Sequence, residues 1–252
     1  MTKEFILGVL QELSRNEIVE AEGIASINKH LLQHNVTTLN LSCNRILDVN
    51  KIDDVGAKVI VAALKGSHVT SLNLEDNKIG AEGAKAIAAA LKGSHVTSLD
   101  LGDNDIGAEG AKAIAAALKD SHVTSLDLGS NKIGAEGAKA IAAALKDSHV
   151  TTLHLGINQI SADGAKAIAA GLKGSPVNTL FLRGNKIGDE GVKAIADVLK
   201  DSHVTGLCFS VDEVGAEEKK DIEDGLKGSY VTCLWCDHGQ IMSYKTLNIN
   251  QL

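Results

Sequence analysis

The sequence is poor in aromatic residues and in cysteine, and it contains no long apolar run. Phe, Tyr and Trp together make up 2% of the 252 residues, so the interior must be built from small aliphatic side chains. The four cysteines do not form the even framework of a small secreted domain, and they indicate reduced thiols and a cytoplasmic location. No apolar run approaches the roughly 20 residues that a membrane helix requires.

An excess of basic residues is also missing. The chain has 25 Lys and Arg against 32 Asp and Glu, which gives a formal net charge of −7. A general nucleic-acid-binding protein needs a basic surface for the phosphates, and a peripheral membrane protein needs a basic face for lipid headgroups. We therefore expect neither nucleic acid nor a membrane as the partner. The apolar run from Phe5 to Leu10 is also too short for the core of a signal peptide.

What the sequence does contain is an internal repeat of 27 residues. Its template reads HVTSLDLGxNKIGAEGAKAIAAALKGS, and one valine marks each copy. These valines are Val69, Val96, Val123, Val150, Val177, Val204 and Val231. Val36 begins an earlier copy, 33 residues before Val69, and its six extra residues lie between Ile46 and Gly56. The chain therefore contains about eight repeats, and the period should set the architecture.

Each repeat divides into a strand half and a helix half. Residues 123–128 alternate in polarity and begin with β-branched side chains, which predicts a short strand. Residues 135–146 place Ile141, Ala144 and Leu145 at helical spacing among alanines, which predicts a helix. Because a unit of this size cannot bury a core alone, stacked units must share one. We expect an α/β solenoid with parallel strands on its concave face and helices on its convex face.

The strand half carries a specific signature. The pattern Val69-x-x-Leu72-x-Leu74-x-x-Asn77-x-Ile79 resembles the LxxLxLxxNxL motif of leucine-rich repeats, and it recurs from Leu99, Leu126, Leu153 and Leu180. Together with the helix half, residues 20–240 resemble the ribonuclease-inhibitor subfamily, which includes the sensor region of NOD-like receptors and the Ran GTPase-activating proteins. The resemblance implies a horseshoe in which the signature asparagines satisfy buried backbone groups. These asparagines are Asn44, Asn77, Asn104, Asn131, Asn158 and Asn185.

We expect a single domain over residues 1–252. An amphipathic helix over residues 1–19 would cap the first repeat, and the repeats would occupy residues 20–240. Residues 241–252 arrive too early to begin another regular repeat, so they would form a C-terminal cap. We find no linker to a second domain, and we expect a monomer.

The residue between the two strand leucines should face solvent, because alternate strand residues point to opposite sides of a sheet. From the fifth repeat on, this residue and its neighbours depart from the template. The resulting patch would contain His154, Ile157, Phe181, Arg183, Cys208, Val211, Trp235 and His238. Exposed aromatic and Arg side chains are typical of binding hot spots, so we predict that this patch binds a partner. The alternative is drift in the terminal repeats, with Trp235 packed under the C-terminal cap.

A second, acidic patch should lie on the same face in the earlier repeats. Its members would be Glu75, Asp76, Asp100, Asp103 and Asp127. Such a patch would steer an electropositive partner, or it would only keep the array soluble.

The remaining motifs do not predict catalysis, a metal or a cofactor. Cys233 and Cys236 form a C-x-x-C pair, but residues three apart in a strand face opposite sides, which argues against zinc or redox chemistry. A row of histidines before the strands could chelate a metal, but copied loop residues explain it better; the row is His68, His95, His122, His149 and His203. Lysines of the helix halves should pair with acids three residues earlier; these are Lys85, Lys112, Lys139, Lys166 and Lys193. The repeated GAEGAK turn lacks the Gly-Lys-Ser/Thr end of a phosphate-binding loop.

The leading hypothesis is a non-enzymatic module that binds a protein partner on its concave face. The resemblance implies a cytosolic receptor or inhibitor, or a bacterial effector that acts in the cytosol of a host cell. The alternative function is that of a GTPase-activating protein, with the insertion near Asp48, Asn50, Asp53 and Asp54 as its distinctive loop. A third interpretation is a structural array that self-assembles through its C-terminal end.

Overall fold

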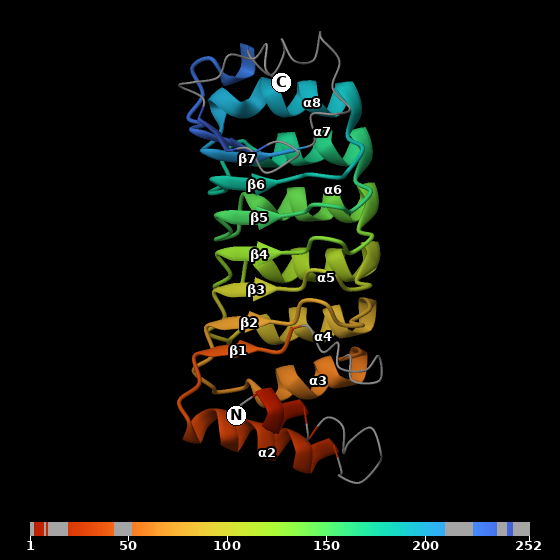
Figure 1. Ribbon diagram of the computed structural model, residues 1–252, viewed down its shortest axis with the longest axis vertical. Helices are drawn as coiled ribbons and strands as arrows, with labels where there is room; N and C mark the ends of the chain where they lie inside the picture. The colour runs from red at the N-terminus through yellow and green to blue at the C-terminus, as the bar shows by residue number, and fades with distance from the viewer. Residues whose placement is uncertain are drawn as a thin grey trace.

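The computed structural model describes residues 3–7, 9, 20–42, 52–209, 224–235 and 241–243. Short strands and helices alternate along one long axis, with the sheet on one side of the stack and the helices on the other (Figure 1). The strands are β1 (Thr38–Asn40), β2 (Ser71–Asn73), β3 (Ser98–Asp100), β4 (Ser125–Asp127), β5 (Thr152–His154), β6 (Thr179–Phe181), β7 (Gly206–Cys208), β8 (Cys233–Trp235) and β9 (Ile241–Ser243). The helices are α2 (Glu20–Gln33), α3 (Asp54–Ala63), α4 (Ala81–Leu91), α5 (Gly107–Leu118), α6 (Gly134–Leu145), α7 (Ser161–Leu172) and α8 (Gly188–Val198), followed by the 3-10 turn η2 (Leu199–Asp201).

The strands form one sheet in chain order from β1 to β9. Strands β1 to β8 are parallel, and equivalent residues of successive repeats stand side by side; Leu99 pairs with Leu126, for example, and Leu126 with Leu153. Only β9 runs antiparallel, against β8. The α/β repeat solenoid predicted from the sequence is therefore confirmed, and the fixed repeat length explains the register.

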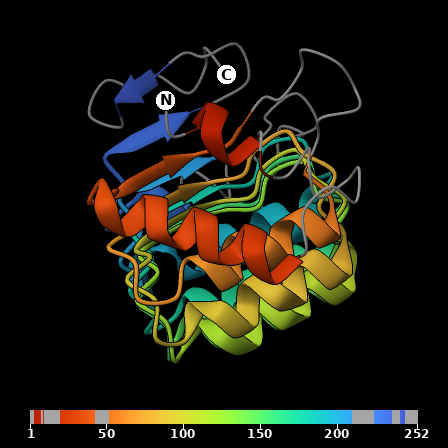
Figure 2. The same ribbon diagram turned by 90° about the horizontal axis from the view of Figure 1, so that it is seen from below.

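The core lies between the sheet and the helix layer, and Figure 2 shows these two layers end-on. Each strand from β1 to β6 contributes one buried leucine and is followed by a second, such as Leu126 and Leu128. Each helix from α4 to α7 contributes a buried isoleucine and a buried leucine, such as Ile141 and Leu145. The helices cover one face of the sheet (Figure 2). The opposite face, which we call the open face, carries the residues between the leucines.

The signature asparagines fix the turns that follow the strands. Asn131 is fully buried, and its Nδ2 donates to the carbonyl oxygens of Leu101 and Gly129 at 2.8 and 2.9 Å. Its backbone N–H donates in turn to Asn158 Oδ1 at 2.9 Å, so the asparagines of neighbouring repeats are linked. The Nδ2 groups of the other ladder residues likewise donate to a leucine carbonyl oxygen of the preceding repeat; these residues are Asn77, Asn104, Asn158 and Asn185. The backbone N–H of Asn158 also donates to Asn185 Oδ1. The ladder expected from the resemblance is confirmed for these residues, whereas Asn44 lies outside the described residues.

The outer face of the helices agrees with the predicted pairing in three repeats and differs in the fourth. Lys85, Lys112 and Lys139 contact the glutamate three residues earlier in their own helices. Lys166 instead contacts Glu190 of the following helix. The prediction for Lys166 was wrong because the acid three residues earlier is Asp163, whose side chain is one methylene shorter than that of glutamate.

Candidate interaction surface on the open face

The polar residues of the open face form a continuous row across neighbouring strands. The parallel register places Asn73 beside Asp100, Asp100 beside Asp127, and Asp127 beside His154. Phe181 follows His154 in the same row. All five side chains are partly exposed, which confirms the predicted orientation of this position from β2 to β6.

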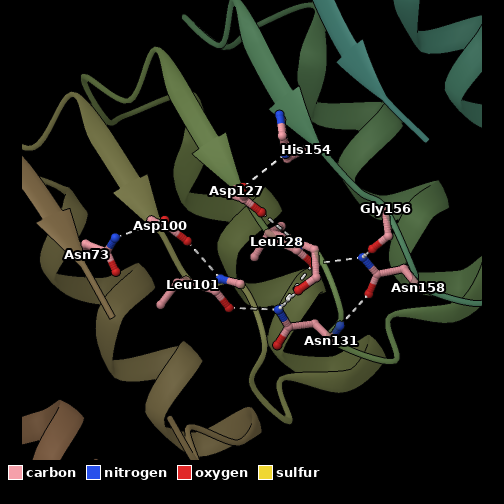
Figure 3. Close-up of polar contacts among 11 residues, drawn as sticks. Asn73, Asp100, Leu101, Asp127, Leu128, Asn131, His154, Gly156 and Asn158 are labelled. Atoms are coloured by element: carbon pink, nitrogen blue, oxygen red, sulfur yellow. Dashed lines mark hydrogen bonds and ion pairs between the residues drawn. The ribbon is translucent and has the colours of Figure 1, made fainter. Parts of the chain in front are cut away.

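Asp100 is held by neighbours on both sides. Its Oδ1 accepts from the backbone N–H of Gly102 at 3.0 Å, and its Oδ2 accepts from Asn73 Nδ2 at 3.1 Å (Figure 3). Burial raises the pKa of the Asp100 carboxyl to about 6. Repulsion from the carboxylates of Asp127 and Glu75 contributes to this rise, and the hydrogen bond from Gly102 opposes it.

The next residues of the row link the acidic part of the face to its aromatic part. Asp127 Oδ1 accepts from the backbone N–H of Gly129 at 2.8 Å, and its Oδ2 lies 3.0 Å from His154 Nδ1 (Figure 3). The imidazole of His154 lies against the ring of Phe181, with ring centroids 3.6 Å apart and planes inclined by 44°. The two predicted patches therefore meet at His154.

Ile157 lies in the turn after β5 and has an unusual backbone conformation. Its φ is 55°, and among the described residues it is the only β-branched residue with a positive φ. A β-branched side chain is disfavoured there by steric contact with its own backbone. The side chain is nevertheless 62% exposed, and its Cγ1 would lie 3.0 Å from a Cβ placed on Gly184 in the next repeat. An exposed apolar group is thus held in a strained turn beside the row.

The other members of the predicted binding patch differ in their exposure to solvent. Arg183 is exposed and lies two residues after the end of β6, and its carbonyl oxygen accepts from Ile157 N–H at 2.8 Å. Cys208 occupies the expected place in β7, but only 8% of it is exposed, so its predicted role as a surface contact is corrected. The cysteine side chain is much smaller than that of Phe181, which is its neighbour in the strand register. The backbone of Trp235 is paired with that of Cys208.

Val211 and His238 lie outside the described residues.

The acidic patch is described in full. Glu75 and Asp76 are partly exposed after β2, and Asp103 is exposed after β3. A Cβ placed on Gly102 would lie 3.3 Å from Asp100 Oδ1 and 3.6 Å from both Asp127 Oδ1 and Glu75 Cγ, so these three acids surround one glycine.

Among the described residues, no group of three or more His, Cys, Asp and Glu side chains could hold a metal ion. Two histidines of the row before the strands are engaged with the preceding repeat: His95 Nδ1 lies 3.2 Å from the carbonyl oxygen of Ser67, and His203 Nδ1 lies 2.9 Å from that of Ser175. Cys236 of the C-x-x-C pair lies outside the described part of the chain.

The acids at the end of the insertion cap helices. Asp53 Oδ1 accepts from the N–H groups of Val55 and Gly56 at the start of α3. Asp54 Oδ1 accepts from Gly80 and Gly83 at the start of α4, at 2.7 and 2.8 Å. Side-chain caps of this kind satisfy N–H groups that have no partner within the helix, so both carboxylates have a structural role. Asp48 and Asn50 of the insertion fall outside the described residues.

Sequence reasoning missed two features of this surface. Asn73 is not among the residues predicted for the acidic patch, although its amide donates to Asp100. The strain at Ile157 was also missed. Aligning the repeats could have revealed it, because Asp76, Asp103, Ser130 and Gly184 occupy the same place with φ between 50° and 72°.

Comparison with known proteins agrees with the repeat architecture. The leucine-rich repeat family model matches residues 33–49, 67–88, 94–115, 119–142, 146–169 and 176–196. No curated protein matches the chain in sequence. A similar solved structure is the leucine-rich repeat-containing protein LegL7 from Legionella pneumophila, with a TM-score of 0.56 and 22% identity over 91% of this chain and 74% of that chain. None of the helices within the described residues has the length and apolarity to cross a membrane. This chain belongs to the leucine-rich repeat family.

Proposed function

We propose that this protein binds a protein partner on the open face of its sheet, through the patch formed by His154, Ile157, Phe181 and Arg183. Leucine-rich repeats act typically as interaction scaffolds, which supports the general assignment. The finer assignment depends on the chemistry of this patch, which the preceding repeats do not share.

The observation that carries the proposal is Ile157. An apolar β-branched residue with a positive φ costs on the order of 1–3 kcal/mol, and its exposure recovers little of that cost by burial. Strain of this kind persists at sites where it serves recognition or catalysis. Contact with an apolar group of a partner would bury the exposed part of Ile157. The free energy gained by that burial would offset the conformational cost of the positive φ.

The groups of the patch also contact one another before any partner arrives. Phe181 contacts the His154 ring, His154 contacts Asp127, and Asp127 is fixed by Gly129. Little side-chain entropy would be lost on binding, because these groups already hold one arrangement. Phe181 would serve as the aromatic anchor and Arg183 as a polar contact at the edge.

The test compares capture of proteins from a cell lysate by four forms of the full chain: wild type, Ile157→Asn, Phe181→Ala and Ser130→Asn. Ser130 occupies the same turn one repeat earlier, so Ser130→Asn is the matched control. We expect the control to retain the captured protein, and each patch variant to reduce its recovery at least about tenfold. Equal recovery by wild type and Ile157→Asn, with thermal melts that show both folded, would refute the proposal.

No feature of the described structure favours GTPase activation, because the two described acids of the insertion cap helices. An effector role in a host cytosol stays a prediction from the family resemblance. A translocation reporter fused to the chain would test it, and retention of the reporter in the bacterium would exclude delivery.

A further inference from the structure

The open face changes its chemistry in one direction along the stack. Strands β2 to β4 and their turns carry the acidic patch, and β5 and β6 carry the apolar and aromatic groups. Arg183 follows at the far end of this series, two residues after the end of β6. A partner that lies along the stack from the N-terminal repeats onward therefore contacts the acidic patch first, then the apolar side chains of Ile157 and Phe181, and then the positive charge of Arg183.

We infer that the partner contributes a segment that runs along the stack, with an apolar side chain on Ile157 and Phe181 and a basic side chain beside Asp100 and Asp127. This inference rests on the proposed function, and it specifies the chemistry and direction of the bound segment. The occupant is an extended basic–apolar segment of a protein.

Charge complementarity supports the basic end. Asp100 and Asp127 are each held by a backbone N–H, from Gly102 and Gly129 respectively, so their carboxylates are positioned before binding. Glu75 lies beside them, around Gly102. The only cationic or imidazole contact described for this trio of acids is the one between Asp127 and His154. An incoming Lys or Arg would relieve the repulsion within the trio, which favours a cation over a neutral or acidic side chain.

The orientation of the bound segment follows from Arg183, at the end of the surface opposite to the acidic patch. A segment bound in reverse would place its basic side chain near Arg183 and its apolar side chain on carboxylates. Juxtaposing like charges and burying carboxylates under an apolar group both disfavour that orientation. The basic side chain therefore belongs at the end of the segment nearer the N-terminal repeats.

The spacing follows from the sheet. Asp100 in β3 and Phe181 in β6 are three strand steps apart, and neighbouring strands are about 4.8 Å apart, which gives roughly 14 Å. An extended chain rises about 3.3 Å per residue, so about four to five residues separate the basic and apolar side chains.

The experiment selects a displayed library of random linear peptides on the immobilised full chain. The counter-selection uses Asp100→Asn/Asp127→Asn, which should fold because Asn40 and Asn73 occupy the same position in the first two repeats. We expect enrichment of peptides with Lys or Arg about four to five positions from Leu, Ile or Phe. A representative synthetic peptide should bind about tenfold more weakly to the double variant and to Ile157→Asn, and equally well to Ser130→Asn.

Two different failures are distinguishable. Enriched peptides that require Ile157 but carry no basic residue at this spacing would overturn the inference and leave the proposed function intact. If no enriched peptide depends on Ile157 or Phe181, both the inference and the proposed function fail.

Discussion

At the scale of single residues, Ile157 carries a conformational cost that its equivalents avoid. Asp76, Asp103 and Gly184 are residue types that adopt a positive φ more readily than isoleucine. We therefore predict that Ile157→Asn raises the free energy of unfolding by about 1 kcal/mol, because asparagine tolerates this conformation. Urea denaturation of the variant and of Ser130→Asn gives the comparison. A variant less stable than wild type would mean that the contact with Gly184 outweighs the strain.

Asp100 gives the row a defined dependence on pH. Its pKa is raised to about 6, above the ordinary value of 3.8 that applies to the unfolded chain. The folded state thus binds the proton of the Asp100 carboxyl more tightly than the unfolded chain does. The contribution of this group to the free energy of unfolding is fully present below about pH 4, and it is lost as the pH rises through about 6. The charged groups that face the carboxyl are Asp127, Glu75 and His154.

We therefore predict that Asp100→Asn changes stability in a pH-dependent manner. Because the variant removes the buried charge, its unfolding free energy relative to wild type should rise by about 1–2 kcal/mol between pH 4 and pH 7.5. Urea denaturation at a series of pH values measures the difference. A difference that is constant across this range would show that Asp100 is not the group that titrates.

At the scale of elements, the distance between helices depends on single glycines. Gly171 in α7 packs directly on α6, and a Cβ placed on it would lie 2.4 Å from the carbonyl oxygen of Ala142. The equivalent residue of the preceding helix is Ala144, so the α5–α6 pair lacks this glycine. The same close approach recurs at Gly225, where a placed Cβ would lie 2.4 Å from the carbonyl oxygen of Ala196 in α8. The approach at Gly171 occurs in the repeat where the chemistry of the open face changes.

The consequence is a prediction that opposes helix propensity. Gly171→Ala should lower the free energy of unfolding by about 1–3 kcal/mol, because α7 must move away from the α6 backbone. Helix propensity alone would raise the free energy of unfolding by about 1 kcal/mol. The sign of the change in this free energy, measured by chemical denaturation, therefore decides between the two effects. Ala144→Gly is the control, and it should cost only about the propensity difference of 1 kcal/mol.

The turns depend equally on the asparagine ladder. Asn131→Ala would remove the side-chain partner of the Leu101 and Gly129 carbonyl groups and of the Ile106 N–H group, and we expect a loss of about 2–4 kcal/mol. Thermal and urea unfolding measure this loss, with the exposed Asn178→Ala as control. Similar melts for the two variants would contradict a structural role of the ladder.

At the scale of the whole molecule, the fixed period should allow one complete repeat to be removed without changing the register of the others. Removal of residues 81–107 joins Gly80 to Ala108 and deletes one complete repeat, so every later strand keeps its register. We predict a folded protein with an unchanged circular dichroism signal per residue, a lower melting temperature and a smaller urea m-value, because one repeat interface is lost. Removal of residues 81–93 alone should abolish cooperative unfolding, since it breaks the period.

The sequence by itself determined the period, the register of the parallel strands, the buried leucines and the asparagine ladder from Asn77 to Asn185. Each of these follows from positions that are repeated in every copy, so one unit and its period suffice to predict them. Only the tertiary structure decided the burial of Cys208, the pairing of Lys166 with Glu190 and the strain at Ile157. These features depend on which side chains and backbone turns of adjacent repeats meet in space, and residues that differ between repeats meet in combinations that the template does not contain.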